Sequence, residues 1–157
     1  MTVDSLCVTT WRARPVSFVS LMTLYESNYI RLRALVGDVR SLSGRHVSRV
    51  AGDCDLHLEP VEQNPYTTVL RLTYLFDDAA GQTADPDLEV RVYHDARLAE
   101  ACAGAARLRH PGLSGLRDRL PKGLGERWLR NMLLNKWLDY CTERGHRFAQ
   151  AVAPGAA

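Results

Sequence analysis

Three polar residues, Asp55, His57 and Glu59, stand at alternate positions in the stretch DCDLHLE. In a β-strand alternate residues face the same side, so these side chains would line one surface. Carboxylates and an imidazole are ligands for a divalent metal ion, provided that a further ligand such as His94 or Asp95 converges on them. The triplet is therefore a candidate metal site, and His57 and Glu59 are candidate ligand-binding residues. The simpler interpretation is a solvated sheet face, because alternating polar and apolar residues produce such triplets automatically.

The stretch YHDARLAEAC (93–102) places a histidine beside an aspartate. His94 as a general base with Asp95 as its orienting carboxylate would be a catalytic pair, so both are candidate catalytic residues. Adjacent strand residues point to opposite faces, however, so such a hydrogen bond requires a turn. The turn alone explains Asp95, whose side chain can accept hydrogen bonds from the following backbone amides. We therefore interpret this stretch as a hairpin corner, with Tyr93 and His94 as candidate ligand contacts.

Two further residues are candidates for ligand binding. Lys122, in PKGLGERW (121–128), precedes an expected helix whose free amides would attract an anion. The stretch is not a GxxxxGK[ST] phosphate-binding loop, and an ordinary loop before a helix explains it equally. Asn28 lies within the first expected helix, where a buried amide would need hydrogen-bond partners. We expect Asn28 either to bond to the sheet or to contact a ligand.

Two helices are expected to flank a sheet. Apolar residues recur at helical spacing over 17–36, and Gly37 can end that helix. The expected apolar stripe is Phe18, Leu21, Tyr25, Leu32 and Leu35. A second helix is predicted over 126–144, with Gly145 as its stop.

Between the helices the hydrophobic period changes to two. Strands are predicted over 55–59, 66–76 and 88–94, and DDAAGQTADPD (77–87) is expected to be a polar loop. The alanine-rich segment 96–108 is ambiguous, because its intrinsic propensity favours a helix. The order of elements predicts an α+β domain, with an N-terminal helix, an antiparallel meander sheet of about five strands, and a C-terminal helix packed on the sheet. We expect one domain over 17–147, an extension over 1–16 and a disordered tail over 148–157.

The net charge of +2 hides an uneven distribution. Residues 1–52 carry seven basic and three acidic side chains, residues 53–100 carry three and eleven, and residues 101–157 carry ten and four. The basic segment 107–130 could attract an anion, a nucleic acid or an acidic partner. It lacks the interleaved aromatic residues of a single-strand nucleic-acid platform, so nucleic acid is the less favoured partner.

The four cysteines lie about forty residues apart, without the CxxC spacing of zinc or redox sites. No secretory leader is recognisable after Met1, and no apolar run approaches the roughly 18 residues that span a bilayer. We therefore expect a cytoplasmic protein with reduced thiols, no membrane partner and no cofactor. The sequence does not indicate the oligomeric state.

Four segments together resemble the YqiB-like proteins, an uncharacterised bacterial family with a domain of unknown function, DUF1249. They are LMTLYESNYIRLRAL (21–35), PYTTVLRL (65–72), EVRVYHDARLAEAC (89–102) and NMLLNKWLDYCTERG (131–145). The resemblance implies that 97–103 continues as a strand after YHDA, and we adopt this over the helical propensity. It implies no activity or site residues. The stretch HPGLSGLRDRLPKGLGER (110–127) departs from the family pattern, being more basic and richer in glycine.

These observations favour a non-catalytic binding or regulatory module for a protein or a small anionic ligand, with a nucleotide as one such ligand. One alternative is a metal-assisted hydrolase that acts on a nucleotide-like substrate at the Asp55, His57, Glu59, His94 and Asp95 positions. Another alternative is nucleic-acid binding through the segment 107–130.

Overall fold

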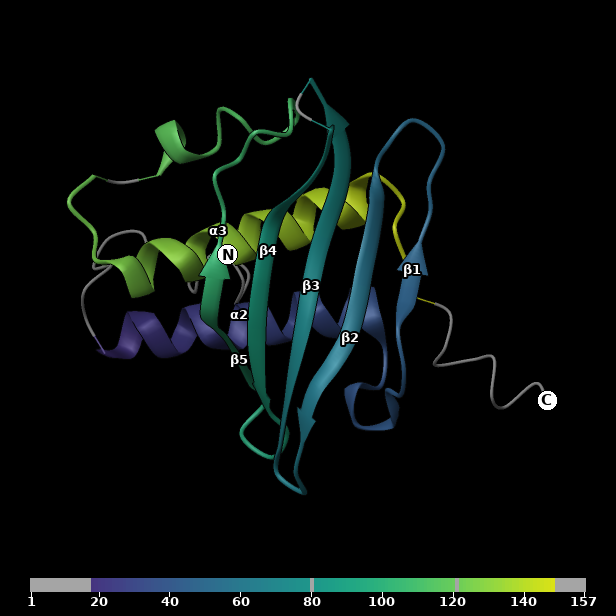
Figure 1. Ribbon diagram of the computed structural model, residues 1–157. Coiled ribbons are helices and arrows are strands. Elements are labelled where there is room, and N and C mark those ends of the chain that lie inside the picture. The colour runs from purple at the N-terminus through teal and green to yellow at the C-terminus, as the bar shows by residue number, and fades with distance from the viewer. Residues whose placement is uncertain (1–17, 80, 121, 149–157) are drawn as a thin grey trace.

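The computed structural model describes residues 18–79, 81–120 and 122–148 (Figure 1). Five antiparallel strands form one sheet in the order β1-β2-β3-β4-β5. They are β1 (His46–Ser48), β2 (Asp55–Gln63), β3 (Thr67–Asp78), β4 (Gly81–Tyr93) and β5 (Leu98–Ala105). The helices are α2 (Phe18–Val36) and α3 (Glu126–Glu143), with short 3-10 turns η1 (Val39–Ser41) and η2 (Arg117–Arg119). This arrangement confirms the predicted α+β meander with a helix at each end.

The helices α2 and α3 lie side by side across one face of the sheet (Figure 1). Asn135 Nδ2 donates to Ser27 Oγ at 2.9 Å, and Arg31 Nε donates to Asp139 Oδ1 at 2.8 Å. From the first contact to the second, the residue number rises by four in α2 and by four in α3, so the two helices run in the same direction. The opposite face of the sheet carries no helix in the described part of the chain.

The core lies between this helical layer and the sheet. In β2, Leu56 and Leu58 are fully buried, and their cross-strand partners in β3 are Tyr74 and Leu72, which are buried as well. The same face continues through Leu88, Val90 and Val92 of β4 and Ala99 and Ala101 of β5. The period-two pattern of the sequence therefore marks the face that the helices cover.

The predicted stripe of α2 is wrong at its first member. Phe18 is 74% exposed, whereas Leu24, Asn28, Leu32 and Leu35 are buried. Phe18 is the first residue of α2, and the contacts to α3 and β5 form further along the helix, around Asn28. Helical periodicity alone does not reveal where a neighbouring element begins to pack.

The predicted polar loop over 77–87 is also wrong, because most of it extends β3 and β4. Phe76 pairs with Thr83, and the ladder continues to Asp78 and Gly81. Backbone hydrogen bonds hold such a ladder whatever the side-chain pattern. Burial in β4 begins within this stretch, at Asp85 and Pro86, and the alternation of buried apolar residues begins at Leu88.

The segment after YHDA forms β5, as the resemblance implied and the intrinsic propensity did not. At the other end of the chain Phe148 is buried, and its N–H donates to the Leu35 carbonyl at 3.1 Å. The packed domain therefore includes Phe148, which we expected to begin the tail. The extension 1–16 and the rest of the predicted tail lie outside the described residues. None of the described helices is long and apolar enough to cross a membrane.

Candidate functional site

The triplet Asp55, His57 and Glu59 lies on the open face of the sheet. Its three side chains are half-buried, and they alternate with the buried Leu56 and Leu58. Asp55 lies 3.3 Å from Arg49, and Glu59 lies 3.5 Å from Arg45, both in exposed ion pairs. The two carboxylates thus already have cationic partners of their own.

His94 does not join this triplet, because it belongs to the other side of the sheet. Its Nε2 lies 2.9 Å from Thr68 Oγ1, and both residues are buried on the side that the helices cover. The metal hypothesis needed a further ligand such as His94 or Asp95 to converge on His57. Strand parity places His94 on the other face, and Asp95, in the turn after β4, pairs with Arg40 instead. Tyr93 points to the open face instead, where its hydroxyl donates to Glu100.

Asn28 is one of three buried asparagines that join the helices to each other and to the edge strand. Its Nδ2 donates to the Ala99 carbonyl at 3.3 Å, and its Oδ1 accepts from Asn135 Nδ2 at 3.0 Å. Asn131 completes the group through Asn28 and the backbone of β5. Of the two roles considered for Asn28, the contacts support hydrogen bonding to the sheet.

Lys122 is exposed in the loop before α3. That helix begins after Gly125, and no side chain caps its first turn. Lys122 is not among the residues that line the pocket described next.

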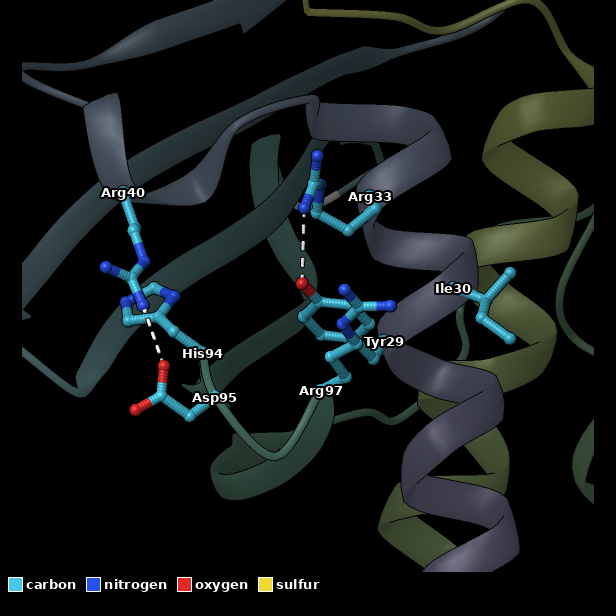
Figure 2. Close-up of a pocket in the computed structure, with 7 residues that line it drawn as sticks. All are labelled: Tyr29, Ile30, Arg33, Arg40, His94, Asp95 and Arg97. Carbon is cyan, nitrogen blue, oxygen red and sulfur yellow. Dashed lines mark hydrogen bonds and ion pairs between the residues drawn. The ribbon is translucent and has the colours of Figure 1, made fainter.

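His94 and Asp95 open onto a pocket between α2, η1 and the turn from β4 to β5 (Figure 2). The pocket has a volume of about 680 Å³, within the range of roughly 300–1,000 Å³ that is usual for ligand sites. Its walls are Tyr29, Ile30, Arg33, Arg40, His94, Asp95 and Arg97. Among these seven residues are three guanidinium groups and one carboxylate, so the lining is cationic.

The three arginines differ in whether their guanidinium groups have partners within the protein. Arg40 Nη2 donates to Asp95 at 3.1 Å, in an exposed ion pair. Arg33 donates to the Tyr29 hydroxyl at 3.2 Å and lies 6.0 Å from the centre of that ring. Arg97 has no side-chain partner among the described residues.

Arg97 also has an unusual backbone. Its φ angle is 56°, in the left-handed region that residues with a Cβ atom seldom adopt. Such conformations cost roughly 1–3 kcal/mol and are concentrated at functional sites and tight turns. The turn between β4 and β5 therefore holds a guanidinium in the pocket at a conformational cost.

His94 faces the same pocket from its buried end. Burial lowers the pKa of the His94 imidazole, and the charge of Arg40 lowers it further. The ring is consequently neutral at pH 7. Since His94 bonds to Thr68 and Asp95 bonds to Arg40, each member of the supposed catalytic pair has another partner.

A second polar cluster surrounds the carboxylate of Asp53, which is almost fully buried. His110 Nε2 lies 3.2 Å from Oδ1, and His146 Nε2 lies 2.9 Å from Oδ2. The Tyr74 hydroxyl donates to Oδ2 at 2.8 Å. Burial opposes the charge, but the hydrogen bonds from Tyr74 and His146 outweigh it and hold the pKa of Asp53 below its usual value.

The ligand atoms of Asp53, Cys54 and His110 lie within 4.8 Å of one another, a spacing that would suit a metal ion. The tautomer of His110 argues against this use. The Gly112 N–H donates to His110 Nδ1 at 3.0 Å, so Nδ1 carries no proton, and the proton of the neutral ring lies on Nε2. Burial also raises the pKa of the Cys54 thiol to about 12. We therefore interpret the Asp53 cluster as a hydrogen-bonded part of the core.

Sequence reasoning missed most of the pocket. Arg33, Arg40 and Arg97 are far apart in the sequence and form no motif. Two local signals were available: Tyr29 and Arg33 are one helical turn apart, and Arg97 closely follows His94. Neither signal indicates a pocket until the topology brings α2 beside the turn after β4.

Comparison with known proteins assigns no activity to these residues. The family described as "Protein of unknown function (DUF1249)" matches residues 31–147. The chain is 29% identical over 128 residues to "Uncharacterized protein YqiB" of Escherichia coli strain K12, a match that covers 82% of this chain and 90% of that protein. The proteins of the same name from Escherichia coli O6:H1 and O157:H7 match to the same extent. No solved structure matches this chain.

Proposed function

The chain belongs to the family described as "Protein of unknown function (DUF1249)", and we propose that it is a non-catalytic binding module for a small anionic ligand. The ligand lies in the pocket between α2 and the β4–β5 turn. The observation that carries this proposal is the guanidinium of Arg97, which lines the pocket without a partner among the described side chains. Arg33 and Arg40 line the same pocket.

The chemistry of the lining favours an anion with several acceptor oxygens. A guanidinium has five N–H donors in a planar fork, and it pairs with carboxylate or phosphate in a bidentate manner. Arg33 uses one donor on Tyr29 and Arg40 uses one on Asp95, so most donors remain free for a ligand. Hydrogen bonds between ionised partners are also roughly twice as strong as neutral ones.

The partner of Asp95 supports binding over catalysis. A histidine that acts as general base is commonly oriented by a carboxylate. Asp95, the carboxylate next to His94, is turned toward Arg40, and the His94 ring is bonded through Nε2 to the Thr68 hydroxyl. In this proposal His94 and Asp95 are therefore pocket walls that shape the anion site.

A titration with inorganic phosphate tests the proposal. At constant ionic strength, phosphate is expected to raise the melting temperature of the protein, because a ligand that binds only the native state stabilises it. Arg97→Ala should weaken phosphate binding about tenfold or more, since a hydrogen bond to a charged group contributes roughly 1.5–3 kcal/mol. Arg119→Ala, which removes an exposed arginine outside the pocket, is the matched control and should bind like the wild type.

Two results would overturn the proposal. One is the absence of any phosphate-dependent shift in the wild type. The other is an equal loss of affinity in Arg97→Ala and Arg119→Ala, which would mean that the overall positive charge, and not the pocket, attracts the anion.

A further inference from the structure

We infer that the pocket takes a ligand with two linked phosphoryl groups, of the class of inorganic pyrophosphate and diphosphate esters. This inference rests on the proposed function and names the ligand class for the same site. Three observations carry it: the arginines lie in two groups within the pocket, the Asp95 carboxylate is already bonded to Arg40, and the pocket is larger than a single phosphate.

The cationic side chains form two groups (Figure 2). Arg40 lies with His94 and Asp95 on one side of the view, and Arg33 with Tyr29 and Arg97 on the other. The first group comes from η1 and the start of the β4–β5 turn, and the second comes from α2 and the end of that turn. Two separate groups of donors suit two separate anionic groups better than one.

Asp95 marks a position where an anionic oxygen already sits. Its Oδ1 lies 3.1 Å from Arg40 Nη2, and its side chain is 72% exposed. An exposed ion pair of this kind contributes only about 0–1 kcal/mol, so a ligand oxygen can replace the carboxylate at little cost. The first group is thus an anion subsite, which the carboxylate of Asp95 occupies through a weak ion pair with Arg40.

The second group has no carboxylate among the lining residues. Arg33 and Arg97 together offer ten N–H donors in principle, and the Tyr29 hydroxyl accepts one of them. A phosphoryl group presents three acceptor oxygens, whereas a carboxylate presents two, so it satisfies this donor-rich wall more fully. We place the first phosphoryl group here and the second at Arg40.

The volume agrees with a ligand larger than one oxyanion. At about 680 Å³ the pocket could hold roughly twenty water molecules at about 30 Å³ each, and a single phosphate would fill a small fraction of it. Ile30 and the ring of Tyr29 supply apolar surface beside the arginines, which would accommodate an organic group esterified to the diphosphate.

The test compares inorganic phosphate, pyrophosphate and succinate by isothermal titration calorimetry, in metal-free buffer at constant ionic strength. Linking two phosphoryl groups should make pyrophosphate bind about tenfold more tightly than phosphate, or better, because the second contact becomes intramolecular. Arg40→Gln should weaken pyrophosphate about tenfold and leave phosphate within about twofold, since it removes only the second subsite. Arg97→Ala should weaken both, and Arg119→Ala should weaken neither.

The outcomes separate the two proposals. If phosphate and pyrophosphate bind equally, or if Arg40→Gln weakens both to the same degree, the two-subsite inference is overturned and the anion pocket stands. If succinate matches pyrophosphate, the phosphoryl class is wrong. If phosphate does not bind, the proposed function fails together with this inference. Because the Arg40 side chain is exposed, Arg40→Gln is expected to fold, and far-ultraviolet circular dichroism of each variant checks it.

Discussion

Asn131 pairs with the backbone of Ala101 as a neighbouring strand would. Its Oδ1 accepts the Ala101 N–H at 2.7 Å, and its Nδ2 donates to the Ala101 carbonyl at 3.4 Å. Ala101 lies in β5, an edge strand of the sheet. The unpaired backbone groups of an edge strand are a template for aggregation. Here the side chains of Asn131 and Asn28, on the two helices, form hydrogen bonds with some of these backbone groups.

The first prediction concerns the stability of this junction. Asn131→Ala removes a fully buried amide and leaves the Ala101 N–H and the Asn28 amide short of partners. Each buried group left unsatisfied costs about 1–3 kcal/mol, so we expect the free energy of unfolding to fall by roughly 3 kcal/mol. Urea denaturation measures this change. Asn64→Ala, at an exposed turn, is the control and should lose less than about 1 kcal/mol; an equal loss in both variants would contradict the role of Asn131.

Much of the fold was predictable because burial on one face leaves a periodic trace in the sequence. The alternation around Leu56 and Leu58 predicted β2, and the helical spacing predicted α2 and α3. The extension of β3 and β4 through 77–87 left no such trace, since that part of the hairpin is held by backbone pairing and by hydrogen bonds to the carboxylates of Asp85 and Asp87, without an alternating apolar face. The alanine-rich β5 was hidden for a related reason: small residues fit where the two helices cross the sheet, and tertiary packing overrides their helical propensity.

A second prediction concerns the carboxylate of Asp53. Asp53→Asn replaces an acceptor of three side-chain hydrogen bonds by an amide, whose NH₂ faces the donors of His110 or His146. We expect a loss of roughly 3 kcal/mol in the free energy of unfolding, because a buried donor network loses its central charge. The pKa of Asp53 is lowered in the folded state, so its contribution is present above the unfolded pKa of about 3.9 and is lost as pH falls through the folded value.

Urea denaturation of the wild type and Asp53→Asn between pH 2.5 and 7 checks both parts of this prediction. The difference in stability between the two proteins should be largest near neutral pH and shrink below about pH 4. Asp118→Asn, an exposed carboxylate, is the matched control for the change in charge. A difference that stays constant down to the lowest pH would rule out a charged Asp53 as the centre of the cluster.

The pocket was less predictable than the fold, because it depends on register and topology. His94 and Asp95 stood out in the sequence, and both line the pocket. His57 stood out equally, yet strand parity puts it on the opposite face, and a shift of one residue in register would have reversed that result. Arg40 and Arg97, two of the arginines that line the pocket, are 57 positions apart in the sequence, and no local pattern connects residues at that separation.

The third prediction uses the depressed pKa of His94. Burial, assisted by Arg40, lowers this pKa in the folded protein, so the unfolded chain binds a proton more readily. Stability is therefore fully present above the unfolded pKa of about 6.5 and falls as pH drops below it toward the folded value. Urea denaturation at pH 7.5 and pH 5 should show this loss in the wild type. The loss should be smaller in His94→Gln and unchanged in His57→Gln, whose side chain lies on the open face; the same loss in all three proteins would assign it to other groups.

The last prediction concerns Asp95, the anion that the chain keeps at Arg40. If Asp95 competes with a ligand, Asp95→Asn should raise the affinity for pyrophosphate about two- to fivefold, because the ion pair that the ligand must replace contributes no more than about 1 kcal/mol. Isothermal titration calorimetry measures the change. Asp118→Asn alters the net charge equally at an exposed position outside the pocket, so it isolates the local effect from long-range attraction. An equal rise in the two variants would mean that Asp95 acts only through net charge, and a fall in Asp95→Asn would mean that its carboxylate positions Arg40 for the ligand.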